Sequence, residues 1–186
     1  MEIEQSQVAK LKITDIEDLD PITVFIEDLD TSKGKITIEC FGKCWSAFWG
    51  GMGERTTAQF VSTVSSSDYI ANCLWDHKDE QYEDDMDAVE SFVKKKVLEL
   101  RRETWLEKDA ARELYEFPNW TEYKPQHIYD DWHCPDLIFA DKDDFEQLEL
   151  EEFDIPERQT RAYKYLLKIV DAVREALNTL NGSKGE

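Results

Sequence analysis

The sequence has few cysteines, glycines and prolines and lacks a long run of apolar residues. Only four of its 186 residues are cysteine, seven are glycine and five are proline. Four cysteines are too few for a disulfide scaffold in a chain of this length. No apolar run reaches the roughly eighteen residues of a transmembrane helix, and the first ten residues, MEIEQSQVAK, lack the basic start and apolar stretch of a signal peptide. We therefore expect a cytoplasmic protein without membrane contact.

Basic residues are also scarce, since 22 lysines and arginines face 42 aspartates and glutamates, a formal net charge of -20. The acids are concentrated, because residues 15–30, 79–90 and 141–154 hold seven, seven and eight of them and a single lysine. A merely solubilising surface would spread its acids evenly, and a strongly negative chain repels the phosphates of nucleic acids. The charge pattern predicts a basic protein partner and no direct contact with nucleic acid.

Apolar and aromatic residues are abundant. Hydrophobic residues make up 41% of the chain and aromatic residues 12%, including six tryptophans. A chain of this length and composition can bury a real core despite its charge. We expect one domain over residues 1–186, with a sheet and two short helices in residues 1–76 and a helical subdomain in residues 84–182.

The first fifty or so residues carry the pattern of an antiparallel meander. Ile36, Ile38 and Cys40 alternate with polar residues, as on a half-buried strand. Strands are predicted over residues 22–28, 35–41 and 44–49, with residues 10–13 as an edge strand.

The last of these strands carries three large rings within five residues: Trp45, Phe48 and Trp49. We expect these rings at the centre of the N-terminal core. Gly50, Gly51 and Gly53 follow, and a glycine cluster after a strand predicts at least one positive φ angle. Thr56 and Gln59 then form the signature of a helix capping box.

Two long amphipathic helices are predicted in the C-terminal half. Apolar residues recur at spacings of three and four over residues 86–100 and again over residues 163–180. We expect Asp84 or Asp85 to cap the first helix, and the sequence DIPE at residues 154–157 to begin the second.

The final helix needs a partner along its length. The other long helix of the chain could supply it, or a second copy in a homodimer, so both a monomer and a homodimer are compatible with the sequence. The pattern as a whole predicts an α+β fold, with a small antiparallel sheet in the N-terminal half packed with a helical C-terminal half.

One stretch resembles a known family. The string KITIECFGKCWSAFWGGMGERT, with the preceding DLDPITVFIEDLD, is similar to small uncharacterised proteins encoded by tailed bacteriophages and prophages. The resemblance covers roughly residues 19–75. It implies a phage origin and a bacterial cytoplasm, and it implies no catalytic or binding residues.

The strongest candidate for a catalytic site is the segment HIYDDWHC at residues 127–134. On a helix, its histidine, aspartate and cysteine side chains could share a face and bind a metal or form a Cys–His pair. This alternative, a metal-dependent hydrolase or nuclease, would use His127, Asp130, Asp131, His133 and Cys134. Pro125 and Pro135 disfavour a helix of that length, so we interpret the segment as structural packing.

A zinc site could in principle take its four ligands from Cys40, Cys44, Cys73 and His77. Against this, Cys40 lies on the apolar face of its strand and Cys73 lies among apolar residues, where buried thiols are common. We expect no metal, no cofactor and no enzymatic activity.

The sequence is therefore interpreted as an acidic binding protein that engages a basic host surface in the host cytoplasm, with DNA mimicry as its more specific form. Duplex DNA presents about one charge per 1.7 Å of axis, so a mimic needs densely placed carboxylates. The alternative is a structural or accessory phage protein whose acids serve only solubility. The candidate partner-binding residues are Asp79, Glu80, Glu83, Asp84, Asp85, Asp87, Asp141, Asp143, Asp144, Glu146, Glu149 and Glu151.

Overall fold

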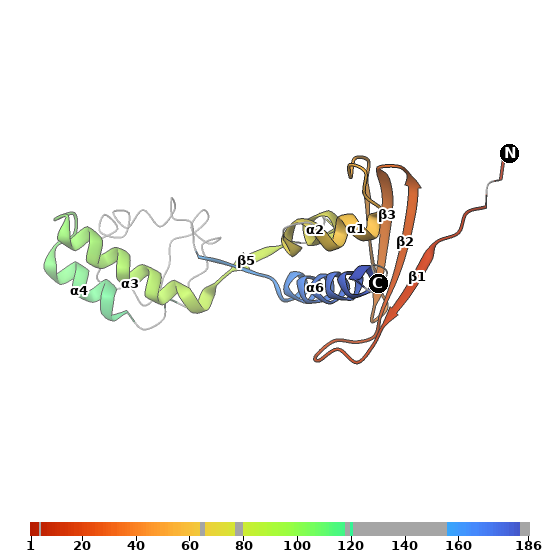
Figure 1. Ribbon diagram of the computed structural model, residues 1–186. Coiled ribbons are helices and arrows are strands. Elements are labelled where there is room, and N and C mark those ends of the chain that lie inside the picture. The colour runs from red at the N-terminus through yellow and green to blue at the C-terminus, as the bar shows by residue number, and fades with distance from the viewer. Residues whose placement is uncertain (4, 64–65, 77–79, 118–119, 121–155, 183–186) are drawn as a thin grey trace. The chain divides into compact units, whose positions relative to one another are not determined.

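Alternation of apolar and polar residues builds a four-stranded antiparallel sheet in the N-terminal half. The computed structural model describes all residues except 4, 64–65, 77–79, 118–119, 121–155 and 183–186. The strands pair in sequence order: β1 (Ala9–Ile13), β2 (Ile22–Asp30), β3 (Lys33–Cys40) and β4 (Lys43–Trp49). This arrangement confirms the predicted meander and its edge strand (Figure 1).

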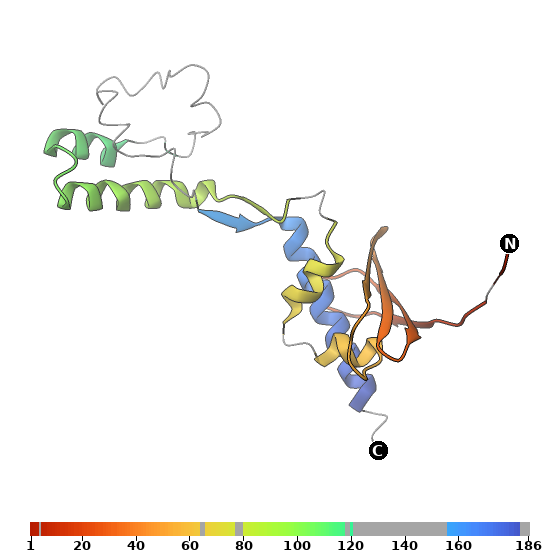
Figure 2. The same cartoon turned by 90° about the horizontal axis from the view of Figure 1, so that it is seen from above.

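Three helices cover one face of this sheet: α1 (Thr57–Thr63), α2 (Ser67–Leu74) and α6 (Arg161–Gly182). Figures 1 and 2 show them on the same side of the sheet in two perpendicular views. Val24 and Ile38, which pair across β2 and β3, are completely buried under this layer. Leu166 and Val170 of α6 are also completely buried there. The α+β class is therefore as predicted.

The C-terminal helix packs differently from the expectation. The contacts divide the chain into unit 1, Met1–Gln81 with Gln159–Glu186, and unit 2, Tyr82–Arg158. Helix α6 belongs to unit 1, where its buried stripe joins the core of the sheet. The prediction that it packs along the other long helix is wrong, because its apolar stripe is buried against the sheet, α1 and α2. The expected helical subdomain at residues 84–182 differs from this division for the same reason.

Phe48 also lies elsewhere than predicted. It is 59% exposed, whereas Trp49 is 6% exposed and Trp45 is half-buried. Strand β4 keeps its period of two through this aromatic run, so successive rings point to opposite faces of the sheet. Only the rings on the helix-covered face enter the core.

The turn into α1 follows the sequence signals. Gly53 has a φ of 67°, which confirms the predicted positive φ. The backbone N–H of Thr56 donates to Oε1 of Gln59 at 3.1 Å, and the N–H of Gln59 donates to Oγ1 of Thr56 at 3.2 Å. These reciprocal bonds are the predicted capping box.

Asp28 fastens the start of α1 to the sheet. Its Oδ1 accepts hydrogen bonds from the backbone N–H and from the hydroxyl of Thr57, each at 2.6 Å. Gly34 lies beneath this contact, and a Cβ atom at that position would overlap the Thr57 hydroxyl. Glycine is therefore required here by close approach of a helix, although its φ is ordinary.

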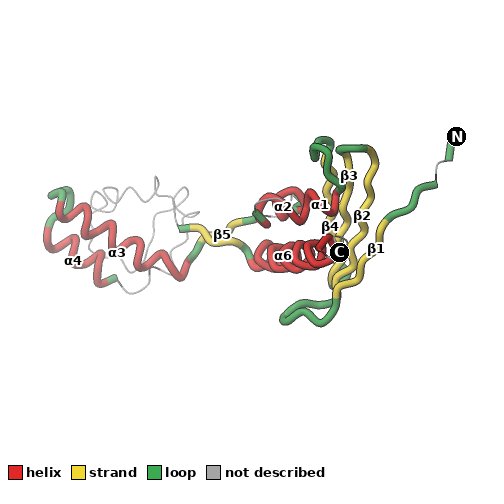
Figure 3. The backbone as a smooth tube through the Cα atoms, in the orientation of Figure 1, coloured by secondary structure: helices red, strands yellow, loops and turns green. Residues whose placement is uncertain are grey.

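Unit 2 contains α3 (Met86–Arg102) and α4 (Lys108–Glu116), which pack side by side around a core of their own (Figure 3). Val93, Val97 and Leu114 are at most 2% exposed in this core. The indole N–H of Trp120 donates to the carbonyl oxygen of Leu114 at 3.1 Å and ties the chain beyond α4 to that helix.

A short antiparallel ribbon stands where a helix start was predicted. Strands β5 (Tyr82–Asp84) and β6 (Glu157–Gln159) form a two-stranded sheet. Helix α6 begins at Arg161. The hydroxyl of the preceding residue, Thr160, accepts a hydrogen bond from the N–H of Tyr163 at 3.3 Å. Asp154 and Ile155 of the DIPE sequence lie outside the described residues. Glu157 lies in β6, so the prediction that this sequence starts the helix is wrong.

Candidate partner-binding surfaces

Three acids of the acidic segment at residues 79–90 gather around one arginine. Arg158, on β6, donates from Nε to Oε1 of Glu83 at 2.9 Å. Its Nη1 donates to Oδ2 of Asp87 at 2.7 Å and to Oδ1 of Asp85 at 3.3 Å. Three carboxylates thus share one guanidinium, and the cluster keeps an excess of negative charge.

Local structure brings these groups together. Asp85 precedes the first residue of α3 and Asp87 lies in its first turn, where the helix dipole favours negative charge. The backbone N–H of Asp85 donates to the carbonyl oxygen of Pro156 at 2.6 Å, which holds the two chain segments together. Hydrogen bonds from Arg158 to Glu83 and Asp87, with the charge of Asp85, raise the pKa of its guanidinium.

Exposure separates the members of the cluster. The side chain of Asp87 is 87% exposed, whereas that of Asp85 is 27% exposed. Asp84 is also exposed and lies on β5. Asp84 and Asp87 can therefore meet a partner, while Asp85 serves the internal ion pair. No cation was paired with these acids in the sequence analysis, whereas the structure places Arg158 among Glu83, Asp85 and Asp87.

The remaining predicted residues are placed as follows. Glu80 is exposed, and its backbone carbonyl accepts a hydrogen bond from the Thr160 hydroxyl at 3.2 Å. The other predicted partner-binding acids lie outside the described residues: Asp79, Asp141, Asp143, Asp144, Glu146, Glu149 and Glu151. The alternative catalytic cluster lies outside them too: His127, Asp130, Asp131, His133 and Cys134.

The cysteines that could be drawn into a zinc site do not form one in the described part of the chain. Cys40 is buried, as expected, whereas Cys44 and Cys73 are exposed. His77 lies outside the described residues. Over the residues that the structure describes, no three histidine, cysteine, aspartate or glutamate side chains are grouped to hold a metal ion.

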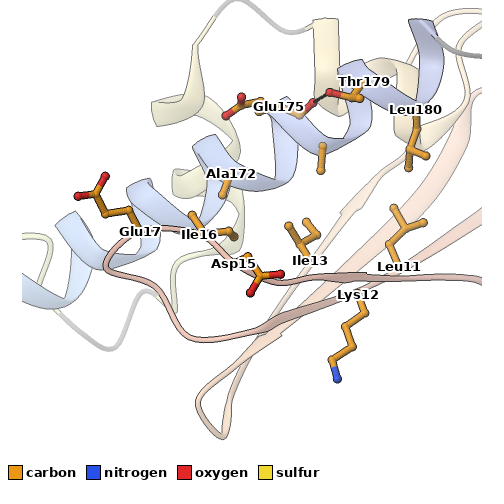
Figure 4. A pocket seen from close by; sticks show the side chains of 11 residues that line it. Leu11, Lys12, Ile13, Asp15, Ile16, Glu17, Ala172, Glu175, Thr179 and Leu180 are labelled. Carbon is orange, nitrogen blue, oxygen red and sulfur yellow. Dashed lines mark hydrogen bonds between the residues drawn. The ribbon is translucent and has the colours of Figure 1, made fainter.

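Unit 1 contains a groove that sequence reasoning missed. It lies between α6 on one side and β1 with its following loop on the other, and has a volume of about 620 Å³. Its apolar lining comes from both sides: Leu11, Ile13, Ile16, Ala172, Ala176 and Leu180. Figure 4 shows Leu11 and Ile13 directed toward the helix, while Lys12 points away from it. The sequence contains only a weak signal for this groove: two alternating apolar residues in β1, and two alanines four positions apart in α6.

The margin of the groove is acidic. Asp15, Glu17 and Glu175 line it together with Lys12, so acids outnumber bases. Asp15 adopts a φ of 62°, a left-handed conformation that aspartate tolerates better than most residues. The loop between β1 and β2 thereby brings acids from the first acidic segment to the edge of an apolar surface.

None of the helices in the described ranges combines the length and the apolar character needed to cross a lipid bilayer. Comparison with known proteins identifies a family for this chain. The profile of a family described as a phage family matches residues 1–179. No curated protein and no solved structure matches the chain. The resemblance noted over residues 19–75 is confirmed and extends over most of the chain.

Proposed function

The chain belongs to this phage family, and from that premise we propose that it is a binding protein whose exposed carboxylates engage a basic surface of a host protein in the host cytoplasm. The proposal assigns no catalytic step and no cofactor to the chain. It locates the contact on the acidic segment around the start of α3, together with the acidic segment at residues 141–154.

The observation that carries the proposal is the carboxylate cluster around Arg158. Glu83, Asp85 and Asp87 share this one cation, and Asp84 adds a further exposed acid next to them. Anchoring by Arg158 limits the motion of Asp87 without covering its carboxylate, which is the arrangement a charge-complementary interface needs. A purely solubilising acid gains nothing from being held in place.

DNA mimicry is the more specific form of the proposal. A protein that replaces DNA must present acids at a density comparable with one charge per about 1.7 Å of duplex axis. Four acids within Glu83–Asp87, two on β5 and two at the start of α3, supply such a local density. In this form of the proposal, duplex DNA competes with the protein for its host partner.

The experiment begins with capture of a host protein from bacterial lysate and continues with a binding titration. The test variant carries Asp84→Asn and Asp87→Asn, which removes two exposed charges and leaves the half-buried Asp85 in place. The matched control carries Glu107→Gln and Asp109→Asn, two exposed acids in and just before α4. We expect the test variant to bind the captured protein about tenfold more weakly at low salt.

The dependence of affinity on salt should also be flatter for the test variant, because exposed charge pairs are screened over about 8 Å at physiological ionic strength. The control variant should bind like the unmodified protein. Equal affinities and equal salt slopes for all three proteins would leave solubility as the only role of these acids. Competition by a short DNA duplex distinguishes DNA mimicry from a basic site that does not bind nucleic acid.

A further inference from the structure

The groove in unit 1 is a part of the sheet that the helical layer leaves uncovered. Leu11 pairs with Val24 and Ile13 pairs with Ile22, so each pair lies in one row on the same face of the sheet. Val24 and Ile22 are completely buried, whereas Leu11 and Ile13 are only half-buried. An apolar sheet face is stable when another element covers it. On β1 that cover is incomplete.

The wall opposite β1 has the shape that a helix can approach. Ala172 and Ala176 lie one turn apart on α6 and line the groove with small side chains, and Leu180 continues the line at 43% exposure. Helices pack about 8–10 Å apart, with the closest approach over small residues. A further helix laid beside α6 would cover Leu11 and Ile13 and extend the existing layer by one element.

The charged side chains at the margin of the groove favour one kind of helix over another. The groove carries Asp15, Glu17 and Glu175 at its margin against the single Lys12. An amphipathic helix with acidic flanks would be repelled there, whereas one with lysines or arginines beside its apolar stripe would meet opposite charge.

We propose that this groove binds a basic amphipathic helix of a partner protein, with the apolar stripe of that helix on Leu11, Ile13, Ala172 and Ala176. From the proposed function this inference takes only the premise that the partner is basic. It adds the secondary structure of the recognised segment and its place on unit 1. It also gives the acids of the loop after β1 a role that the carboxylate cluster of unit 2 does not fill.

The test uses the full chain and a labelled synthetic peptide of about fifteen residues, roughly four helical turns. The peptide contains leucine and lysine, with the leucines at i, i+3, i+4 and i+7. A scrambled peptide of the same composition keeps its charge and loses its apolar stripe, and a third peptide has glutamate in place of lysine. We expect fluorescence anisotropy to show the ordered basic peptide binding more tightly than both others.

Variants of the protein locate the binding. Ala176→Leu fills the groove without changing the charge, and should weaken binding of the ordered peptide about tenfold. The control is Ala162→Leu, at an exposed position of the same helix outside the groove, which should have no effect. Leu180→Ser removes apolar surface from an exposed position and should also weaken binding, so the test does not depend on one variant folding well.

Methyl NMR spectra of the full chain should show the ordered peptide shifting the signals of Leu11, Ile13 and Ala172. Equal binding of the scrambled peptide, or equal binding by Ala176→Leu, would overturn the inference. A dimer that dissociates on Ala176→Leu substitution would overturn it too, because a second copy would then occupy the groove.

This test is separable from the test of the proposed function. The variant with Asp84→Asn and Asp87→Asn should bind the ordered peptide as tightly as the unmodified chain, because its changes lie in unit 2. Loss of host-protein binding with intact peptide binding would show that the substitutions affect the carboxylate cluster and leave the groove unchanged. Loss of peptide binding with intact host-protein binding would show an effect on the groove alone.

Discussion

The two units bury their apolar residues in different ways. In unit 1, strands from the first fifty or so residues share a core with α6, which follows more than a hundred residues later. In unit 2, the described core comes from α3, Leu106, α4 and Trp120, which are close in sequence. The first core is assembled from contacts between residues far apart in sequence and the second from contacts between residues close in sequence. Only the packing of unit 2 could therefore be inferred from helices that follow one another in the chain.

The acids of the two units also differ in use. In unit 1, Asp28 caps α1 from the sheet, and the backbone N–H of Thr31 with the charge of Lys33 lowers the pKa of Asp30. In unit 2, the acids converge on Arg158 and remain partly exposed. Acids of one segment, residues 15–30, thus hold the fold together at Asp28 and also line the groove at Asp15 and Glu17, so acid content alone does not locate an interface.

The largest effect should come from placing a charge in one core at a time. Val170 is completely buried in unit 1, so Val170→Asp should remove several kcal/mol from the free energy of unfolding and unfold this unit. Val97→Asp makes the same change in the core of unit 2, where Val97 is 1% exposed. Circular dichroism and amide NMR spectra would show which signals each variant loses.

A control for both variants is Asn178→Asp, at an exposed position of α6, which should fold normally. We expect Val97→Asp to leave the amide signals of β2 and β3 in place, because the two units have separate cores. Loss of the whole spectrum in both variants would show that the two units fold only together.

The next largest effect tests the close approach of α1 to the sheet. Gly34→Ala would force a Cβ against the Thr57 hydroxyl and to within 3.0 Å of the Glu27 carbonyl oxygen. Overpacking of this kind costs about 1–3 kcal/mol. Gly51→Ala is the matched control, because nothing lies within 4 Å of the added atom and its φ is ordinary. Urea denaturation would compare the two variants with the unmodified chain.

Thr57→Ala sharpens this test, because it removes the atom that the new Cβ would meet. The double variant should lose less stability than the sum of the two single variants. Additive losses would place the strain elsewhere, at the Glu27 carbonyl or the Met52 side chain.

Much of the fold could be predicted because its signals are local. Alternation marked β2 and β3, Thr56 and Gln59 marked the start of α1, and the glycine cluster marked a turn with positive φ. Phe48 was misplaced because its size was taken to outweigh its position in the alternation. The partner of α6 could not be predicted from its stripe, because such a stripe fits a sheet and a helix equally well.

The candidate surfaces were less predictable. Acidic runs are visible in the sequence, but the cation that organises Glu83 and Asp87 lies more than seventy positions away at Arg158. The groove depends on which strand the helical layer fails to cover, and no local pattern encodes that. Two of its acids, Asp15 and Glu17, lie in the acidic segment at residues 15–30, which was identified from the sequence without assignment to a site.

A smaller effect is expected from breaking the ion pairs of unit 2. Arg158→Met leaves three carboxylates without their cation and should loosen the pairing of β5 with β6. The Arg158 side chain is 39% exposed, so solvent screens these ion pairs and the loss of stability should be small. Hydrogen exchange at the N–H of Asp85, which is bonded to the Pro156 carbonyl, would report it.

Lysine lacks the planar, forked guanidinium that bonds several carboxylates at once. The rate of exchange at the Asp85 N–H in Arg158→Lys should therefore lie between the rates in the unmodified chain and in Arg158→Met. Arg112→Met is the control in the same unit, because Arg112 pairs with the single carboxylate of Glu116 on the surface of α4. It should leave exchange at Asp85 unchanged. Equal exchange in all variants would mean that backbone pairing alone holds the ribbon.

The smallest effect is expected where an apolar side chain faces solvent in either unit. Phe48 is 59% exposed on the sheet face opposite the helices, and Leu98 is 44% exposed on α3. Phe48→Thr and Leu98→Gln should each change the free energy of unfolding by about 0.5 kcal/mol or less, since surface substitutions away from special features rarely do more. Trp49→Ala, one residue further along β4, should cost about 3–5 kcal/mol. Thermal denaturation of the three variants measures the contrast, and a large loss for Phe48→Thr would mean that another surface covers the outer face of the sheet.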